Sequence, residues 1–591
     1  MREQWILATK RGDFDGIARA CGISPVTARL LVNRGAATLE DVRRFLNGTL
    51  ADLADPLTML GVRETRDRLL LAADRGEGVT IAGDYDADGI FSSVILRTAL
   101  TRLGIRAVID VPDRRDEGYG MNLRIVSEAL ARGDQIILTC DNGVSAFEAI
   151  HEAKANGLTV LVTDHHEIPY EKEGEEIRWL PTEADAVVDP HQPGCQYPFK
   201  NLCGAGVAFT LVRALYAAAQ IPEEETNELL PYAAIATVAD VMELSGENRI
   251  LVREGIARLE KTSHPGLKAL MTEQDIFDRQ LTEYHLGFIL GPCFNAAGRM
   301  GRLPLAFSLL EEKDPRNAQL LAQELCRLNN ERKELTRRGA KLAEEWLAAE
   351  DGLREPVLVA ELPEEYDPLA GIIAGRLREA YHKPAFVMVK NQEGYKGSGR
   401  SVDQYNMFEA LSAMRGLFVH FGGHPMAAGL TVKEECYNEF LTRIRSECGL
   451  PAEGSPERVD IDLALPVSYV TRDLIRELDL LAPFGKGNPR PLFARAHLSV
   501  SKLSYMGTAK RALKLMVSEG GGAPAEAVFF GDAEGFVEFI RSEFGEEELS
   551  KLFAGRPNQV DLALAYTPRI NEFRGVRRVQ LLVTNYCRID R

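Results

Sequence analysis

The chain has 591 residues, enough for several domains of about 100–200 residues each. Its 45% hydrophobic and 27% charged residues are ordinary for a globular protein, and no stretch approaches the roughly 18 apolar residues of a membrane span. These values argue against a membrane protein. The N-terminal residues contain no apolar signal segment, and the nine cysteines form no C-x-x-C pair, so we expect a cytoplasmic protein with reduced thiols.

The net charge of −17 argues only weakly against a polyanionic partner, because binding depends on the local electrostatic field. Residues 480–518 contain no Asp or Glu. They contain these basic residues: Lys486, Arg490, Arg495, Lys502, Lys510, Arg511 and Lys514. We therefore expect a basic face near the C-terminus of an otherwise acidic chain.

Helical patterning marks residues 1 to about 50, with helices expected at Ser24–Asn33 and Leu39–Leu46. From Gly78 onward, short apolar strands alternate with helices such as Asn122–Arg132 and Ser145–Ala155. The expected strands are Val79–Ala82, Ala107–Val111, Ile136–Thr139, Val160–Thr163 and Ala186–Val188. This alternation predicts an α/β fold with a doubly wound parallel sheet.

Three carboxylates, Asp84, Asp86 and Asp88, follow the first of these strands, before the helical pattern of Ile90–Leu103. They lie at the sheet edge where open α/β folds bind ligands. Unpaired carboxylates repel one another and are costly to desolvate, which favours a bound divalent cation. The alternative is a solvated acidic turn that caps the next helix.

Polar side chains also follow the later strands. Asp141 and Asn142 follow the strand at 136–139, Asp164-His165-His166 follows the strand at 160–163, and Asp240 ends the apolar run 236–239. Because parallel strands share one carboxyl edge, we expect five side chains to meet there: Asp84, Asp86, Asp141, His165 and Asp240. Carboxylate and imidazole ligands without thiolate indicate Mn²⁺ or Mg²⁺.

Several longer motifs carry a family resemblance. Residues 84–89 (DYDADG), 140–143 (CDNG), 164–166 (DHH) and 236–244 (ATVADVMEL) resemble the successive motifs of the DHH phosphoesterase superfamily. Residues 111–122 (VPDRRDEGYGMN), 202–209 (LCGAGVAF) and 291–301 (GPCFNAAGRMG) resemble, more specifically, RecJ-type single-stranded-DNA exonucleases. The resemblance extends from about residue 40 to the C-terminus.

The resemblance implies two metal ions held by the five side chains, with Asp141 bridging them, and two-metal hydrolysis of a phosphodiester. The implied catalytic residues are Asp84, Asp86, Asp141, His165, His166 and Asp240. His166 either faces the scissile phosphate or makes a supporting hydrogen bond, and Asp164 is expected to orient an imidazole. Asp88 either supports the site or caps the helix that begins near Gly89.

Phosphatase relatives in the superfamily often carry a His four residues before the first motif Asp. In this chain that position is Thr80. We therefore expect one metal ion to lack a protein ligand.

Residues Pro304 to Ala349 form a long, charged stretch with leucines near helical spacing. We interpret it as a helical connector between two lobes. The alternative is an ordinary helix on the flank of the first domain.

A second α/β unit follows, from Pro356 to about Gly449, with strands expected at Val357–Ala360 and Ala385–Val389. Residues 397–401 and 421–425 are glycine-rich and are expected to be loops that offer N–H groups to an anion, with Pro425 opening a helix. Glycine loops alone are weak evidence, since many are only turns.

In context, this unit resembles the DHH-associated domain, which binds substrate across a cleft from the metals. The implied substrate-binding residues are Arg114, Asn142, Arg299, Ser398, Arg400, Gly422, Gly423 and His424. Arginine suits a substrate phosphate, including a terminal 5′-phosphate, because its planar guanidinium binds phosphate bidentately. The less favoured alternative for each arginine is a plain surface residue. Where relatives usually carry a Trp-His segment, this chain has Tyr366-Asp367, so a contact from that His is expected to be lost.

The last part of the chain is predicted to be an all-β, OB-like barrel. Its expected strands are Val459–Leu465, Ala496–Ser501, Leu513–Val517, Ala527–Phe530, Val560–Ala565 and Val579–Thr584. Its basic stretch and its aromatic residues Tyr505, Phe529, Phe530 and Phe573 are typical of a groove for single strands. A core position is favoured for Phe529 and Phe530, which lie in an apolar strand. Residues 481–493 (LAPFGKGNPRPLF) resemble the linker into the RecJ OB domain.

The expected domains are residues 1–50 (helical), 51–303 (DHH catalytic), 304–352 (connector), 353–452 (DHH-associated) and 456–591 (OB). The resemblance implies a 5′→3′ exonuclease of single-stranded DNA that releases 5′ mononucleotides in repair and recombination, with a helicase and a single-strand-binding protein as partners. One alternative is a phosphodiesterase of short oligonucleotides or dinucleotides, for which a basic barrel is unnecessary. Another is a non-catalytic single-strand-binding scaffold, against which the five retained ligand positions argue.

Overall fold

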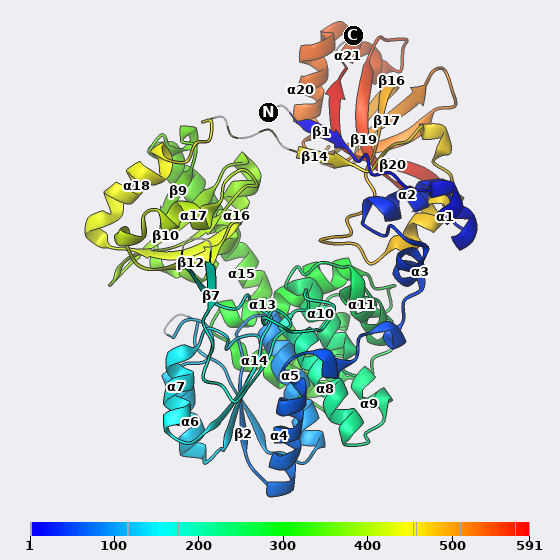
Figure 1. Ribbon diagram of the computed structural model, residues 1–591. Helices are drawn as coiled ribbons and strands as arrows, with labels where there is room; N and C mark the ends of the chain where they lie inside the picture. The colour runs from blue at the N-terminus through cyan, green and yellow to red at the C-terminus, as the bar shows by residue number, and fades with distance from the viewer. Residues whose placement is uncertain are drawn as a thin grey trace. The chain divides into compact units, whose positions relative to one another are not determined.

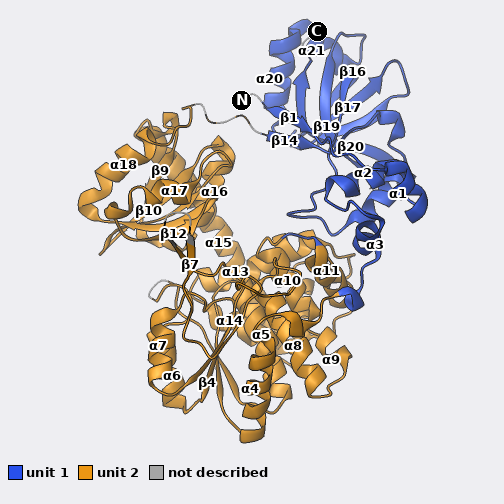
Figure 2. Cartoon of the chain, in the orientation of Figure 1, with its two compact units in different colours: residues 1–52, 243–245, 457–591 blue, residues 53–242, 246–456 orange. Residues whose placement is uncertain are grey.

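The structure is a computed structural model that describes residues 3–114, 117–173, 176–452, 454, 456, 458–507, 510–573 and 575–589. The chain forms two compact units (Figure 2). Unit 1 comprises residues 1–52, 243–245 and 457–591, and unit 2 comprises residues 53–242 and 246–456. Within the described ranges, no helix is both long and apolar enough to cross a membrane.

The sheet that carries the predicted acids lies in unit 2 and is wholly parallel. In spatial order its strands are β3 (Ala107–Asp110), β2 (Val79–Ala82), β4 (Ile136–Thr139), β5 (Thr159–Thr163) and β8 (Ala186–Val188). Because β3 and β4 lie on opposite sides of β2, the direction of winding reverses there, which opens a crevice at the carboxyl ends of β2 and β4. Ala82 pairs with Thr139, so these two ends are level.

Helices cover both faces of this sheet (Figure 1). One face carries α4 (Val62–Arg75) and α5 (Ala87–Arg102), and the other carries α6 (Leu123–Arg132) and α7 (Phe147–Ala155). Apolar residues of α6 and α7 share one buried core with β2, β4 and β5. The doubly wound parallel sheet that the sequence predicts is thereby confirmed.

Further helices follow in the chain, some of which pack directly against α5. They are α8 (Gly204–Ala218), α9 (Glu223–Asn227), α10 (Leu230–Ala239), α11 (Gly246–Leu259), α12 (Pro265–Glu273), the π-helix η3 (His285–Leu290), α13 (Gly291–Arg299) and α14 (Leu303–Glu311). The apolar run before Asp240 is therefore the end of a buried helix, α10, and does not belong to the sheet. A short apolar run alone does not distinguish a buried helix from a buried strand. A small hairpin, β6 (Tyr170–Glu173) with β7 (Glu176–Trp179), follows β5.

The connector is one helix, α15 (Pro315–Ala349), whose 35 residues make it about 50 Å long at 1.5 Å per residue. Its first half packs against α12 and α13, where Cys326 receives a hydrogen bond from Gln274. Ala343 and Leu347, near its end, belong to the core of the second α/β part. The predicted long helical connector is confirmed.

The second α/β part of unit 2 has a five-stranded sheet. In spatial order its strands are β12 (Phe418–His424), β13 (Ala427–Val432), β11 (Gly394–Arg400), β10 (Ala385–Asn391) and β9 (Leu358–Leu362). Its helices are α16 (Ala370–Tyr381), α17 (Met407–Ser412) and α18 (Tyr437–Ser446). In this sheet β9 and β10 pair in parallel, and the other described pairings are antiparallel.

The two glycine-rich segments lie mainly in strands, which corrects the prediction of loops. In β11, a Cβ at Gly397 or at Gly399 would lie 2.3 or 2.5 Å from a methionine sulfur of the core, so the strand packs there only as glycine. Pro425 opens no helix: it lies in the two-residue turn between β12 and β13, whose last pair is His424 with Ala427.

Unit 1 contains the predicted barrel. Its sheet order is β15 (Leu463–Ala464), β16 (Phe493–Met506), β17 (Ala512–Glu519), β18 (Ala525–Phe529), β20 (Val576–Arg588) and β19 (Asp561–Phe573). A further pairing of β16 with β19 closes the sheet on itself. The part is not all-β as predicted, because α19 (Arg472–Leu478), α20 (Ala533–Phe544) and α21 (Glu546–Ala554) accompany the strands.

The N-terminal helices belong to the same unit as the barrel. They are α1 (Phe14–Cys21), α2 (Pro25–Asn33) and α3 (Leu39–Asn47), and their buried residues share one hydrophobic core with barrel residues such as Leu474 and Leu498. The first strand, β1 (Gln4–Leu7), pairs in parallel with β14 (Arg458–Ile461). Segments from the two ends of the chain thus fold together.

Candidate metal centre and substrate site

The loop after β2 holds its first two carboxylates tightly. Asp86 is the N-cap of α5, and its Oδ1 accepts hydrogen bonds from the N–H groups of Asp88 at 2.9 Å and Gly89 at 3.1 Å. Asp84 is 2% exposed, and its Oδ1 has no hydrogen-bond partner among the residues that the structure describes. A Cβ at Gly89 would lie 2.5 Å from the carbonyl oxygen of Asp84, so this turn requires glycine. The cap of α5 is therefore Asp86, and the alternative that Asp88 caps this helix is wrong.

Asp88 instead binds the start of α8. Its carboxylate accepts hydrogen bonds from the N–H groups of Gly204 at 2.6 Å and Ala205 at 2.8 Å, where the helix dipole favours negative charge. A Cβ at Gly204 would lie 2.7 Å from that of Asp141, so α8 reaches the loop after β4 at this point. Asp88 thus fixes α8 beside Asp141.

Asp141 follows β4 in a left-handed backbone conformation, with φ of 61°, which aspartate tolerates better than most residues. Its backbone carbonyl accepts a hydrogen bond of 2.5 Å from the hydroxyl of Tyr119, which also lies 3.3 Å from Nδ1 of His166. Tyr119 was not among the predicted site residues. Its position in the segment 111–122, between Gly118 and Gly120, was the available signal.

Asp164 organises the turn that carries the two histidines. Its Oδ1 accepts hydrogen bonds from the N–H groups of His165 at 2.7 Å and His166 at 3.2 Å, and lies 2.7 Å from Nδ1 of His166. Burial by itself would lower the pKa of His166, but the hydrogen bond to Asp164 and nearby carboxylates outweigh it and raise the pKa to about 9. The imidazole that Asp164 orients is therefore that of His166, which is cationic at neutral pH.

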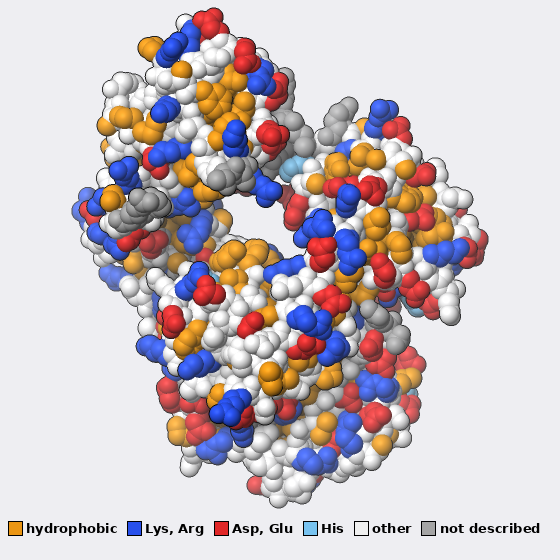
Figure 3. Space-filling model, turned by 180° about the vertical axis from the view of Figure 1, so that it is seen from behind, with side chains coloured by type: hydrophobic (Ala, Val, Ile, Leu, Met, Phe, Trp, Pro, Cys, Tyr) orange, Lys and Arg blue, Asp and Glu red, His pale blue; other side chains and the backbone are white. Residues whose placement is uncertain are grey.

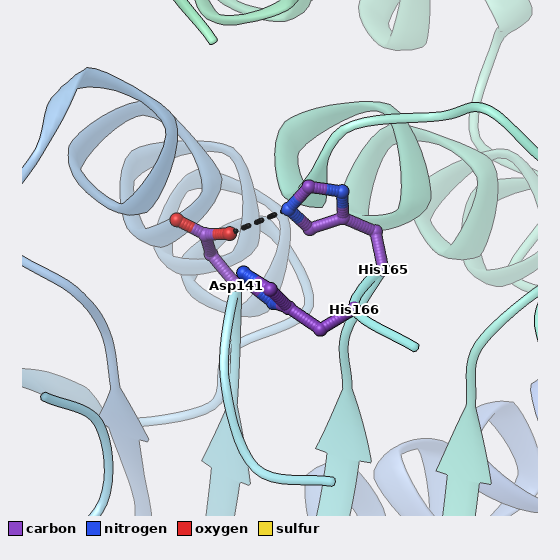
Figure 4. Close-up of side chains that lie close together, drawn as sticks. All are labelled: Asp141, His165 and His166. Carbon is purple, nitrogen blue, oxygen red and sulfur yellow. Dashed lines mark ion pairs between the residues drawn. The ribbon is translucent and has the colours of Figure 1, made fainter. Parts of the chain in front are cut away.

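The imidazole of His165 points toward the carboxylate of Asp141 (Figure 4). Its Nε2 lies 3.0 Å from Oδ1 of Asp141, 3.6 Å from Oδ2 of Asp88 and 4.0 Å from Oδ2 of Asp240. Figure 4 shows Asp141 and the two histidines above the ends of neighbouring strands. Asp240 reaches the same group from the C-terminal end of α10.

The five predicted ligands are thus brought together. Candidate ligand atoms lie within 4.8 Å of one another in three groups: Asp84, Asp86 and Asp141; Asp88, His165 and Asp240; and Asp141, His165 and His166. Burial, followed by the neighbouring carboxylates, raises the pKa of Asp84, Asp86 and Asp141. Buried oxygens that repel one another, one of them without a partner, fit hard divalent cations such as Mn²⁺ or Mg²⁺.

Thr80, at the position where some relatives carry a histidine, is engaged elsewhere. It is fully buried, its hydroxyl donates to Oδ2 of Asp134 at 2.7 Å, and it accepts a hydrogen bond from Arg132 at 3.0 Å. Its side chain therefore serves a buried polar network beside the amino-terminal end of β4.

A cavity of about 750 Å³ opens beside His166. Tyr119 and His166 line it from the first α/β part, and Gly423 and His424 line it from the hairpin β12–β13. Gly423 has φ of 150°, and a Cβ there would lie 2.3 Å from the carbonyl of Ala427, so the tip of this hairpin requires glycine. The predicted residues Gly423 and His424 thus face Tyr119 and His166 across this cavity, while Gly422 precedes them in β12 with an exposed backbone.

Three predicted arginines gather on another side of the centre. Burial, followed by the proximity of Arg114, lowers the pKa of Arg299, and Arg400 also acts on it. The guanidinium of Arg114 lies 4.8 Å from the ring centre of Tyr85, between Asp84 and Asp86 in sequence. Arg299 donates to the carbonyl of Pro368 at 3.2 Å, immediately before α16.

Arg400 packs against the first turn of α16, because a Cβ at Gly371 would lie 2.8 Å from its Nη2. Burial, followed by the nearby Arg378 and Arg114, lowers the pKa of Arg400. Ser398 lies two residues earlier on the same face of β11. Because like charges repel, an anion bound among the guanidinium groups would stabilise this arrangement.

Asn142 has a different position from the other predicted substrate residues. Its Nδ2 donates to the carbonyls of Ala82 at 3.1 Å and Cys140 at 2.9 Å, and its Oδ1 accepts from the N–H of Met121. Both amide hydrogens are used by backbone, and the residue is 1% exposed. Asn142 therefore joins the ends of β2 and β4 to the segment 111–122, and it also lines the cavity beside His166. Its contact to substrate stays a prediction.

The basic stretch of unit 1 is partly neutralised. Arg495 pairs with Glu519, and Lys514 pairs with Glu526 at 2.5 Å. Figure 3 likewise shows basic and acidic side chains interspersed on the visible face. Lys510 lies over the ring of Tyr505, with its Nζ 5.6 Å from the ring centre.

The predicted aromatic residues of the barrel differ in exposure. Phe529 is in the core at 6% exposed, whereas Phe530 is 55% exposed and lies under the guanidinium of Arg569, which corrects its predicted core position. The side chain of Phe573 lies outside the described residues.

Comparison with known proteins agrees with this architecture. The model of the DHH family N-terminal domain matches residues 78–237, the DHHA1 domain matches residues 354–449, and the RecJ OB domain matches residues 461–585. The single-stranded-DNA-specific exonuclease RecJ of Dickeya dadantii is 33% identical over 583 residues, covering 94% of each chain. The chain belongs to the RecJ family. RecJ of Escherichia coli is also 33% identical, over 95% of this chain and 96% of that protein.

RecJ of Bacillus subtilis is 36% identical over 84% of this chain, which spans only 62% of that longer relative. Among solved structures, RecJ of Thermus thermophilus in complex with Mn²⁺ has a TM-score of 0.81 and 27% identity, covering 100% of this chain and 80% of that chain. A second structure of the Thermus protein contains Mg²⁺ and has a TM-score of 0.76 at 25% identity, covering 100% of this chain and 79% of that one. Both cations suggested by the ligand chemistry thus occur in RecJ structures.

Proposed function

We propose that the chain is a metal-dependent exonuclease specific for single-stranded DNA, which removes 5′ mononucleotides. The observation that carries this proposal is the pairing of a buried carboxylate and histidine cluster with a neighbouring cluster of arginines in unit 2. The first suits metal-assisted phosphodiester hydrolysis and the second binds a substrate phosphate. The names of the RecJ relatives support this activity.

Two cations are proposed, held by Asp84, Asp86, Asp141, His165 and Asp240, with Asp141 shared between them. When bound, divalent cations at such a site activate water and stabilise charge on the phosphate and the leaving oxygen. Asp141 suits the shared position because it belongs to two of the three ligand groups and lies 3.0 Å from His165.

The surrounding residues position the ligands and the strand. Asp164 holds the histidine turn and keeps His166 cationic, so that His166 can bind a non-bridging oxygen of the scissile phosphate. Tyr119 fixes the carbonyl of Asp141 and forms part of the wall of the cavity. Gly423 and His424 close that cavity from the other side.

Recognition of the 5′ end is proposed to come from Arg114, Arg299 and Arg400, with Ser398. Arg299 and Arg400 contact the start of α16, whose N–H groups also favour an anion, and the charge of Arg114 acts on both of these arginines. A terminal phosphate bound there would fix the end of the strand relative to the metal centre. The proposed 5′→3′ direction and release of mononucleotides rest on this placement.

The domain roles follow from the same proposal. Residues 51–303 would supply the catalytic side chains, 304–352 the connector, 353–452 the terminal-phosphate site, and 456–591, with the N-terminal segment 1–50, a grip on the strand. A helicase and a single-strand-binding protein are the proposed protein partners, on the family relationship alone. Repair and recombination are the proposed setting.

The decisive experiment uses Mn²⁺ and DNA labelled at either end, offered as a single strand, as a duplex with a 5′ overhang, and as a blunt duplex. We expect mononucleotides from the 5′ end of the single strand and of the overhang. Equal digestion of the blunt duplex, or release that starts at the 3′ label, would contradict the proposal. Short dinucleotides tested alongside will show whether the phosphodiesterase alternative describes the enzyme better.

A further inference from the structure

The strand β11 presents a row of three polar side chains on one face. Lys396, Ser398 and Arg400 alternate with Gly397 and Gly399, and both glycines pack against core methionine sulfurs. Because successive side chains of a strand point to opposite faces, the three polar residues share the face opposite to that core. Ser398 and Arg400 belong to the proposed terminal-phosphate site, and Lys396 continues their row.

The ammonium group of Lys396 is paired with a carboxylate. Its Nζ lies 3.0 Å from Oδ2 of Asp367, and the two side chains are 38% and 24% exposed. Asp367 belongs to the 3₁₀ turn Glu364–Leu369 that leads into α16, and its carbonyl accepts the hydrogen bond from the N–H of Ala370. The ion pair therefore borders the start of the helix against which Arg400 packs.

The neighbouring residue connects this pair to the arginine cluster. The carbonyl of Pro368 accepts the hydrogen bond from Arg299, so Asp367 is one residue away from a backbone group bound by a site arginine. A carboxylate in this position repels additional negative charge. It also occupies an ammonium group that would otherwise have three donors available for a phosphate.

We propose that the ion pair of Lys396 and Asp367 sets how many phosphates a 5′ end can carry at this site, favouring a monophosphate over a triphosphate. The inference rests on the proposed function, because it assigns the pocket of Ser398 and Arg400 to the terminal phosphate. A monophosphate is bound by the arginines and Ser398. The further phosphates of a triphosphate meet a pair of zero net charge, with the carboxylate repelling them.

The test compares Asp367→Asn with the wild-type chain on two single-stranded oligonucleotides of one sequence, carrying a 5′-monophosphate or a 5′-triphosphate. Asparagine keeps the shape of the side chain and releases Lys396. We expect the ratio of kcat/KM for triphosphate over monophosphate to rise about tenfold with Mn²⁺, which is a modest effect for one charge at a partly exposed site. Adding Lys396→Met to this variant should return the ratio to near the wild-type value.

Lys396→Met alone should shift the ratio of kcat/KM for triphosphate over monophosphate in the opposite direction. It leaves the carboxylate of Asp367 unpaired, so the ratio should move further towards the monophosphate. This second variant keeps the proposal testable if Asp367→Asn does not fold. The matched control is Glu434→Gln, which breaks the ion pair of Lys390 and Glu434, 2.5 Å long and more exposed, in the same α/β part. It should leave the ratio unchanged.

A ratio that stays within about twofold of wild type in Asp367→Asn, alongside normal folding, would overturn the inference. So would a wild-type chain that cleaves both 5′ ends equally well. A wild-type chain that cleaves no single strand at all contradicts the proposed function instead. The two failures are therefore distinguishable.

Discussion

The metal centre and the arginine site are two clusters of like charge, and they differ in sign and in how they are held. Burial and mutual repulsion raise the pKa of Asp84 and Asp141, whereas burial and mutual repulsion lower the pKa of Arg299. Each cluster is unfavourable alone, and each is relieved by a ligand of opposite charge. A strand with phosphates and bound cations satisfies both at once.

The two clusters differ in rigidity. Three acids of the centre accept backbone hydrogen bonds: Asp86 caps α5, Asp88 binds the start of α8, and Asp164 holds the histidine turn. The arginines reach their site on long side chains from three separate elements. This difference agrees with the proposed roles, in which the acids hold the cations and the arginines bind the end of a strand.

The largest effect should come from the acidic cluster. We expect Asp141→Ala to lower kcat/KM on single-stranded DNA by on the order of 10⁴-fold, because both proposed cation positions lose a ligand. Single-strand binding should stay within about threefold of wild type, since the arginines and the barrel are untouched. Nuclease kinetics and fluorescence anisotropy measure these two quantities.

The control for this variant is Asp185→Ala, which removes an aspartate at the other end of the sheet, where it pairs with Lys154. It should retain cleavage. Unimpaired cleavage by Asp141→Ala would refute the shared-ligand role of Asp141.

A smaller effect is expected at the arginine site. Arg400→Gln should lower kcat/KM on a 5′-phosphorylated strand by about 10- to 100-fold, which corresponds to the loss of a charge-assisted hydrogen bond. A strand with a 5′-hydroxyl should lose much less. Arg354→Gln, at an 84% exposed side chain, is the control and should change neither rate. Equal losses on the two strands would remove Arg400 from the terminal-phosphate site.

The smallest effect concerns stability. The pKa of Asp84 in the folded state is raised above its ordinary value of 3.8. Its ionisation therefore lowers the free energy of unfolding as the pH rises from the ordinary pKa through the raised one. Asp84→Asn should therefore stabilise the metal-free protein at neutral pH by about 1 kcal/mol, and should reduce the rise in Tm on adding Mn²⁺. Thermal unfolding with chelator and with Mn²⁺ measures both. The exposed Asp67→Asn serves as the control, and an unchanged response to Mn²⁺ in Asp84→Asn would count against Asp84 as a ligand.

Periodicity predicted much of the architecture because the strands of the central sheet are short, wholly apolar and followed by polar residues. Val79–Ala82 and Ile136–Thr139 were expected at the bounds observed. Asp240 shows where periodicity is insufficient. The apolar run before it is a buried helix, and a run that is apolar throughout has no alternation of polar and apolar residues that would distinguish a helix from a strand.

The remaining differences come from contacts between distant segments. Gly397 and Gly399 were read as loop residues, but a strand tolerates them because core sulfurs occupy the space of the missing side chains. Tyr119 and the pair of Lys396 with Asp367 reach their partners only after folding, and no local pattern records those partners. The role of Asp88 likewise depended on α8, 116 residues further along the chain.

The joint core of the first and last segments has a consequence for synthesis. Helices α1 to α3 have their packing partners in residues beyond 457, and all of unit 2 lies between. At about 5–20 residues per second, a ribosome leaves those helices without their core for on the order of tens of seconds. Unit 2 can therefore fold first. The barrel, which is synthesised last, then packs against the N-terminal helices. A chain interrupted before residue 457 would possess the residues for cleavage but leave an apolar N-terminal surface for chaperones or proteases to recognise.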